Sequence, residues 1–278
     1  MKKSDKQAID FEAVRASARI NAPDRYYAAL FAPAALRDDL IAVAAFTGEI
    51  ERIAKLVSDA ALGEIRIVWW RDALLSGDGQ SLSGNPVLDV FADVARRHAL
   101  PPAALEDYLS AHAHALYADP PADDTALDRE LHAIDGTPFA LAVQILGVAN
   151  DENVREVLNA AARAAGFTRI GLDLPHMLMR GRTPFPAGRS PNPFATPQDW
   201  GPQIAWLAER AAEALGTMRR HFAGLPPALT TALLPLALVE PYFRALQKAR
   251  HEPTRDIVEI APLARLWRIG RAHWTGRI

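Results

Sequence analysis

Acidic side chains four residues apart are the first feature that could do chemistry, because this spacing puts them on one face of a helix. Two pairs have it, Asp89 with Asp93 and Asp124 with Asp128. Carboxylates placed in this way can hold a hard cation such as Mg²⁺. Both pairs lie in the acidic middle of the chain, where residues 78–135 carry eleven acids against three arginines. The spacing recurs by chance in such a stretch, so we favour no metal role for either pair.

Other catalytic signatures are missing from the sequence. It has no glycine-rich phosphate loop after a strand, no GxSxG nucleophile elbow and no HExxH zinc motif. It also has no cysteine, which excludes disulfides, thiolate nucleophiles and cysteine-based metal sites. The 31 basic and 33 acidic side chains nearly cancel, so the charge gives no sign of a nucleic-acid partner.

The elements that must position any site read as helices throughout. Alanine and leucine dominate, and no stretch shows sustained two-residue alternation. After Pro33, apolar residues recur every three or four positions, which predicts a long helix with one buried face. That face consists of Leu36, Leu40, Val43, Phe46, Ile50, Ile53 and Val57. Further helices are predicted over residues 62–75, 87–99, 103–117, 127–148, 152–179, 202–223, 228–247 and 263–273, with a proline-rich loop over residues 181–202.

We predict one all-α domain over residues 1–278, of which residues 1–20 could form a flexible segment. The start of the chain has no apolar core typical of a signal peptide, and the longest apolar run, residues 232–239, is too short to cross a bilayer. We expect a cytoplasmic protein, at most peripheral to the inner membrane. From residue 219 onward, ten basic side chains outnumber four acidic ones. This fits either solvated helix faces or a basic C-terminal surface that meets anionic lipid or an acidic partner.

Several segments together resemble the squalene/phytoene synthase family. They occur in the family's order over residues 20–275, which is more specific than any single motif. The resemblance implies an isoprenoid-synthase-like helical bundle around a central cavity. The segments are Arg25-Tyr26, Ala45-Phe46, LGEIRIVWWRDALL at residues 62–75, Asp135-Gly136-Thr137, RGRTPFP at residues 180–186 and PLARLWR at residues 262–268.

That family joins two prenyl diphosphates head to head, and two aspartate-rich helices hold Mg²⁺ against the diphosphates. The resemblance places these motifs at residues 51–55 and 173–177. Glu51 and Asp173 are the remaining carboxylates and the candidate metal ligands. Lys55 and His176 stand where further carboxylates are expected. A lysine repels Mg²⁺ and an imidazole suits it poorly, so the chemistry of the family is in doubt here.

Local chemistry at these motifs leads to two smaller expectations. Glu51 and Lys55 have the spacing of an ion pair along one helix. Pro175, inside the second motif, is expected to kink its helix.

The basic residues of the family are better preserved. The resemblance implies that they line one end of the cavity and hold a phosphate or a carboxylate, although a surface or ion-pair role stays open for each. Of the adjacent Trp69 and Trp70, one is expected in the core. The candidate ligand-binding set is Arg25, Tyr26, Arg66, Trp70, Arg71, Arg180 and Arg182.

Two functions from different classes follow. The stretch GEIERIAKLVSDAALGEIRIVWWRDAL resembles a subgroup of the family that has lost its metal motifs and helps to assemble respiratory complex I. We therefore hypothesise a non-catalytic or repurposed member that needs no cofactor and binds a complex I subunit, a prenyl diphosphate or a lipid-like ligand. The alternative is an active Mg²⁺-dependent prenyltransferase that uses Glu51 and Asp173 with fewer metal ions. A helical lipid-binding module outside both pathways is a third hypothesis.

Overall fold

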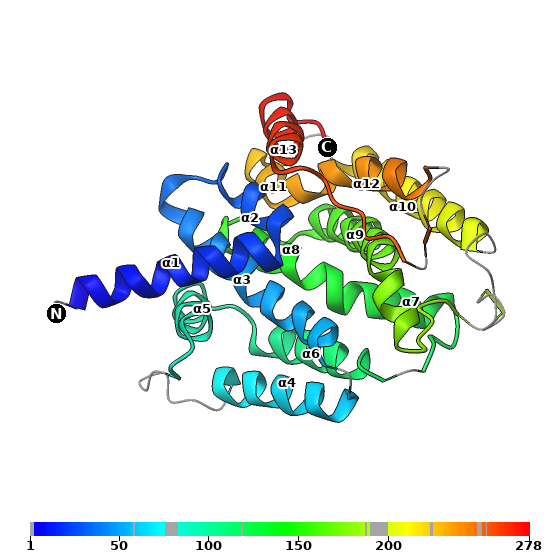
Figure 1. Cartoon of the computed structure of the whole chain (residues 1–278). Coiled ribbons are helices and arrows are strands. Elements are labelled where there is room, and N and C mark those ends of the chain that lie inside the picture. The colour runs from blue at the N-terminus through cyan, green and yellow to red at the C-terminus, as the bar shows by residue number, and fades with distance from the viewer. Residues whose placement is uncertain are drawn as a thin grey trace. The chain divides into compact units, whose positions relative to one another are not determined.

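The structure is a computed structural model that describes residues 3–57, 59–75, 83–117, 119–186, 188–189, 200–222, 225–248, 252–253 and 255–278, with side chains from residue 11 onward. Within these ranges every regular element is a helix (Figure 1). The elements are α1 (Lys3–Asn21), α2 (Pro23–Ala29), α3 (Ala34–Leu56), α4 (Ala60–Leu75), α5 (Pro86–Arg97), α6 (Pro102–His114), α7 (Asp124–Leu131), η1 (His132–Gly136), α8 (Thr137–Ile145), α9 (Glu152–Met179), α10 (Gly201–His221), α11 (Pro227–Leu233), η3 (Leu234–Leu238), α12 (Val239–Leu246) and α13 (Pro262–Thr275).

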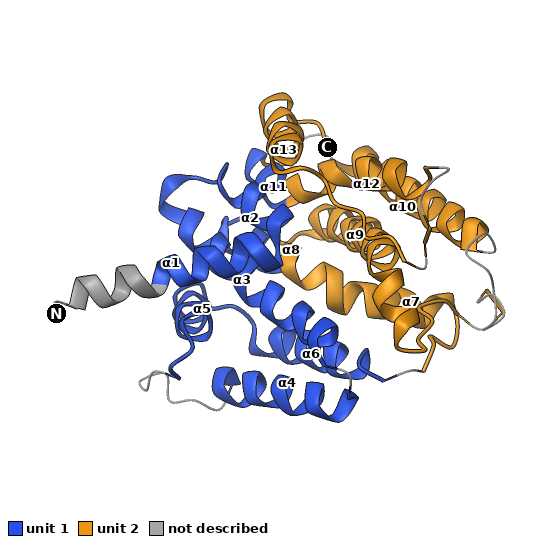
Figure 2. Ribbon diagram, in the orientation of Figure 1, with its two compact units in different colours: residues 1–117, 140–149, 227–232 blue, residues 118–139, 150–226, 233–278 orange. Residues whose placement is uncertain are grey.

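By its internal packing the chain divides into two compact units, which Figure 2 shows in different colours. Unit 1 comprises residues 1–117, 140–149 and 227–232, and unit 2 comprises residues 118–139, 150–226 and 233–278. The single-domain organisation and the central cavity stay predictions. None of the described helices combines the length and apolarity needed to cross a bilayer.

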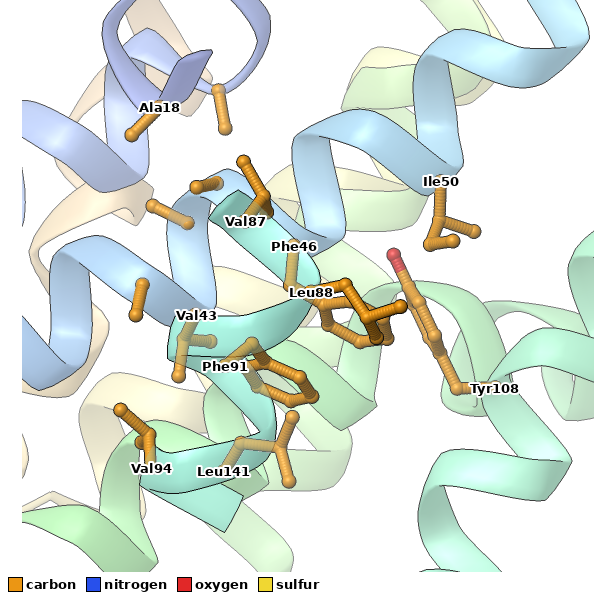
Figure 3. Packing of buried hydrophobic residues seen from close by; sticks show 14 of the residues in the cluster. Ala18, Val43, Phe46, Ile50, Val87, Leu88, Phe91, Val94, Tyr108 and Leu141 are labelled. Atoms are coloured by element: carbon orange, nitrogen blue, oxygen red, sulfur yellow. The ribbon is translucent and has the colours of Figure 1, made fainter. Parts of the chain in front are cut away.

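Unit 1 is built around α3. The predicted buried face of this helix is confirmed. Of the seven residues of that face, Leu36 is half-buried, and the other six are at most 7 % exposed. Phe46 lies at the centre, stacked on Phe91 of α5 with ring centroids 3.9 Å apart (Figure 3).

Helix α1 also belongs to the packing of unit 1. It occupies residues 3–21 and so overlaps residues 1–20, which the sequence predicts as a flexible segment, and its Val14 and Ala18 are fully buried. A Cβ at Gly48 of α3 would lie 2.9 Å from the Cβ of Asn21, so only glycine allows this close approach of α1 and α3.

Unit 2 is built around α9, which begins where the Asp151 side chain accepts a hydrogen bond from the Val154 N–H. The π-helical turn η1 brings Asp135 against α9, where a Cβ at Gly166 would lie 2.7 Å from the Asp135 Oδ2. The helix continues through Pro175 to Met179. Glycine at position 166 is therefore what lets a carboxylate approach the α9 backbone.

Two of the predicted helices are interrupted. Residues 127–148 form α7 and α8, which the π-helical turn η1 separates. Residues 228–247 form α11 and α12, with a 3₁₀ segment between them that contains Pro235. Proline lacks the N–H that closes an α-helical hydrogen bond, which weakens the α-helix at this point. In the predicted loop over residues 181–202, residues 187 and 190–199 lie outside the described residues.

Candidate functional site

The first motif position carries a carboxylate that is already paired. Glu51 on α3 accepts a hydrogen bond from the Arg25 Nη2 of α2, and the two side chains are only 21 % and 26 % exposed. Tyr26, beside Arg25, is half-buried and packs against the core of unit 1. Lys55 follows Glu51 one turn later, and the ion pair expected between them stays a prediction. The guanidinium compensates the negative charge that Glu51 would otherwise offer to a metal ion.

A second acid on α3, Glu49, was missed by sequence reasoning. It accepts hydrogen bonds from the Ser17 Oγ (2.7 Å) and the Asn21 Nδ2 (2.9 Å), both on α1. Glu49 precedes the motif by two residues and matches no spacing that could have singled it out. It ties α1 to α3 close to the Arg25–Glu51 pair along the chain.

A surface pocket of about 520 Å³ opens where the end of α3 meets α4. Its α3 residues lie at three- and four-residue steps, on a different face of the helix from Glu51 and Lys55. Arg66 of the predicted anion-binding set lines it, together with a second cation, Arg52. The full lining is Glu49, Arg52, Ile53, Leu56, Ile65, Arg66, Trp69, Trp70 and Asn85.

The two adjacent tryptophans of α4 have different surroundings, as expected. Trp70 is 5 % exposed and meets Phe46 edge-on at 5.7 Å, whereas Trp69 is 44 % exposed. Arg71, the next residue, donates from its Nε to the Asp72 carboxylate at 3.3 Å and is not part of the pocket lining. Of the predicted ligand-binding residues, Arg66 and Trp70 are thus brought together at one pocket of unit 1.

In unit 2, Asp173 lies on α9 one turn after a strongly paired arginine, Arg169. The Arg169 guanidinium donates two hydrogen bonds to Asp135, at 2.8 Å and 3.0 Å. Burial alone would lower the pKa of Arg169, but the charge and hydrogen bonds of Asp135 raise it, with smaller contributions from Glu130 and Asp173. Asp173 therefore lies in the field of a fixed positive charge.

Beyond the end of α9, two arginines are partly withdrawn from water. Burial lowers the pKa of Arg180. Burial and then repulsion from Arg180 lower the pKa of Arg182, against the weaker attraction of Glu130. Arg97 of unit 1 behaves in the opposite way, because hydrogen bonds to Asp39 raise its pKa. Neighbouring guanidiniums whose charged forms are disfavoured are stabilised by a bound anion.

His176 lies in the last turn of α9, four residues before Arg180. Its Nδ1 is buried and has no hydrogen-bond partner within the described residues. A ring nitrogen of this kind can accept or donate a hydrogen bond, depending on the tautomer of the imidazole.

The groups that surround Glu51 in unit 1 and Asp173 in unit 2 do not fit a Mg²⁺ site within either unit. Glu51 is bound by Arg25, and Asp173 lies near Arg169, so each acid meets a cation rather than a second carboxylate. Mg²⁺ prefers several hard oxygen ligands in octahedral geometry. Across the described part of the chain, no three or more His, Asp or Glu side chains gather closely enough to hold a metal ion.

The two aspartate pairs with four-residue spacing take part in other contacts. Asp89 accepts hydrogen bonds from Ser83 ahead of α5, both 2.7 Å long. The other three carboxylates bind arginines. These contacts are Asp93 with Arg96 and Arg97, Asp124 with Arg189, and Asp128 with Arg163.

The comparisons with known proteins fit this helical architecture. Residues 19–277 match the family described as squalene/phytoene synthase, and the chain belongs to that family. Its structure is similar to the crystal structure of squalene synthase HpnC from Alicyclobacillus acidocaldarius, with a TM-score of 0.64 and 18 % identity over 97 % of this chain and 96 % of that one.

A second similar structure is a dehydrosqualene synthase solved in complex with a ligand. The TM-score is 0.67 at 14 % identity, over 98 % of this chain and 99 % of that one. At these identities the likeness establishes the shared fold, and it confirms the predicted all-α, isoprenoid-synthase-like class. No curated protein matches the sequence.

Proposed function

We propose that this member of the squalene/phytoene synthase family binds an anionic prenyl or lipid-like ligand and does not condense prenyl diphosphates. The observation that carries the proposal is the pairing of Glu51 with Arg25 at the first motif position. Lys55 one turn later adds a second positive charge where the family places a carboxylate. A motif of this kind attracts a diphosphate but repels the metal ions that would activate it as a leaving group.

The anion-binding residues of this proposal are Arg180 and Arg182. Their lowered pKa values indicate charges that a diphosphate or another phosphate would stabilise. His176, with its unpartnered Nδ1, lies on the same stretch and adds a hydrogen-bonding group. In unit 1, we assign the same role to Arg25 and Arg66, which belong to the predicted ligand-binding set.

In the cell, the proposed role is assembly of respiratory complex I at the inner membrane. The support is the resemblance of residues 48–74 to the subgroup of the family with that role. A partner subunit and a peripheral membrane contact belong to this proposal. Deletion of the gene followed by a complex I activity assay on isolated membranes tests it, and normal activity would count against the assembly role.

Ligand binding is tested by titration calorimetry with farnesyl diphosphate in the absence of Mg²⁺. We expect binding by the wild type and at least tenfold weaker binding by an Arg180→Gln/Arg182→Gln variant, since each charge-assisted hydrogen bond contributes about 1.5–3 kcal/mol. Arg210→Gln is the matched control, because Arg210 lies in the same unit and pairs with Glu213 on the surface. Equal affinities for all three proteins would refute the assignment of the anion site.

An active head-to-head prenyltransferase is the second candidate. It is favoured by the fold likeness to the dehydrosqualene synthase and to squalene synthase HpnC, which extends over nearly the whole of each chain. In that case Glu51 and Asp173 would have to serve with fewer metal ions. A turnover that Asp173→Ala leaves unchanged would exclude this mechanism.

A further inference from the structure

Helix α13 carries apolar side chains on two opposite faces, although only one of these faces, which also contains Arg265, packs within unit 2. Residues 263, 267 and 274 lie within about 40° of one another around the helix axis, and residues 265, 269 and 272 lie on the opposite side. A helix with a second apolar face uses that face for another contact.

The inner face holds α13 in unit 2. Ile269 and Ala272 are at most 4 % exposed, and Arg265, at 8 %, donates a hydrogen bond to the Tyr242 hydroxyl at 3.2 Å. The chain end is also fixed, because Arg219 of α10 donates to the Ile278 carbonyl at 2.6 Å. The helix is therefore anchored and cannot rotate to bury its other face.

The outer face carries large apolar side chains in water. Leu263 is 82 % exposed, Trp267 63 % and Trp274 72 %. Two other tryptophans of the chain, Trp70 and Trp200, are each 5 % exposed. Tryptophan combines a large apolar ring with a polar N–H and is favoured at the boundary between lipid and water.

The cations around this face are not neutralised. The chain has no acidic residue after Glu259, yet four arginines follow. Arg265 belongs to the inner face, whereas Arg268, Arg271 and Arg277 form no ion pair with any described residue. Residues 260–278, which include the exposed tryptophans, thus carry a net positive charge.

We propose that the outer face of α13, Leu263, Trp267 and Trp274, docks the protein on a membrane rich in anionic phospholipid, together with Arg268 and Arg271 on the flank of the helix and Arg277 just after its end. The tryptophan rings would insert at the level of the headgroups, and the arginines would bind the phosphates. The inference specifies the peripheral membrane contact of the proposed function. It requires neither a bound prenyl diphosphate nor a complex I subunit.

Charge complementarity favours an anionic membrane as the partner of this face. A short helix with exposed tryptophans on one face and arginines beside that face is the pattern of helices that lie in the membrane interface. Each arginine near an anionic surface strengthens binding about fivefold, and the effect weakens as salt screens it. Binding should therefore depend on both the anionic lipid and the ionic strength.

Vesicle flotation with the full chain tests the proposal. One set of vesicles contains phosphatidylcholine alone, and the other contains phosphatidylcholine with phosphatidylglycerol. We expect the wild type to float with the anionic vesicles only, and to be released by salt. Trp267→Ser/Trp274→Ser should bind roughly tenfold more weakly through its lost apolar contact, and Arg268→Gln/Arg271→Gln about 25-fold more weakly.

The matched control is Ile20→Ser/Leu62→Ser, which removes two exposed apolar side chains from unit 1. It should float like the wild type, and circular dichroism should show that every variant is folded.

The proposal is overturned if the wild type stays off anionic vesicles, binds both kinds equally, or floats no better than the tryptophan variant. It is also overturned if light scattering shows a wild-type dimer that the tryptophan variant lacks, since a second copy would then cover this face. Farnesyl diphosphate binding that persists in the tryptophan variant separates this test from that of the ligand site.

Discussion

Replacing Asp135 by asparagine tests the buried ion pair between Asp135 and Arg169 in unit 2. Asparagine keeps the size of the side chain but removes the negative charge that Arg169 binds through two hydrogen bonds. The two side chains are 7 % and 18 % exposed, so water can replace the lost carboxylate only in part. The guanidinium would then remain charged in a site that was built for an ion pair.

The size of the effect follows from this burial. Removing one partner of a fully buried ion pair costs about 3–5 kcal/mol. The attraction that Glu130 and Asp173 exert on Arg169 compensates part of the loss. We therefore expect Asp135→Asn to lower the free energy of unfolding by about 2–4 kcal/mol.

Urea denaturation of a double-mutant cycle measures this value. Arg169→Met combined with Asp135→Asn should destabilise the protein by less than the sum of the single changes, because no unpaired charge is left. Asp128→Asn is the control, since its pair with Arg163 is more exposed and should contribute no more than about 1 kcal/mol. A loss below about 1 kcal/mol for Asp135→Asn would refute the reasoning.

Three further changes test the packing and the titration of unit 1. Phe46→Ala removes the ring stacked on Phe91 and should cost about 3–5 kcal/mol of unfolding free energy in urea; a cost under 1 kcal/mol would contradict the buried position. Gly48→Ala forces α1 and α3 apart and should lower the melting temperature, at a cost of about 1–3 kcal/mol; an unchanged melting temperature would contradict the close approach. Burial alone would raise the pKa of Asp39, but hydrogen bonds from Arg97 and His98 lower it overall. The resulting stability is present above the ordinary carboxyl pKa and is lost as the pH falls through the lowered value, so Asp39→Asn should flatten the acid side of the pH–stability curve.

The sequence predicts most of the helices because their apolar periodicity is regular. Helix α9 has the predicted bounds, and the buried face of α3 contains the predicted residues. The first two helices were not predicted. Helix α1 has no clear apolar stripe, and its buried Val14 and Ala18 are too few to reveal one. Tertiary contact with α3, rather than local pattern, explains its place in the fold.

The sequence predicts the candidate site less completely than it predicts the fold. The resemblance singled out Glu51 and Asp173, but not the arginines that lie beside them. Arg25, which pairs with Glu51, is on another helix, and Arg169 precedes Asp173 by one turn of α9. Arg25 is 26 residues from Glu51, and Asp135 is 34 residues from Arg169. Pairings at such separations leave no spacing signal in a single sequence. The close approach of the Asp135 carboxylate to α9 likewise requires Gly166, which no local pattern connects to it.

The most direct test of the central claim is the release of inorganic diphosphate from farnesyl diphosphate in the presence of Mg²⁺, with geranylgeranyl diphosphate as a second substrate. We expect no Mg²⁺-dependent release by folded protein that nevertheless binds the diphosphate in calorimetry. Mg²⁺-dependent release that Asp173→Ala abolishes would contradict it, and would make the chain a prenyltransferase that works with two carboxylates.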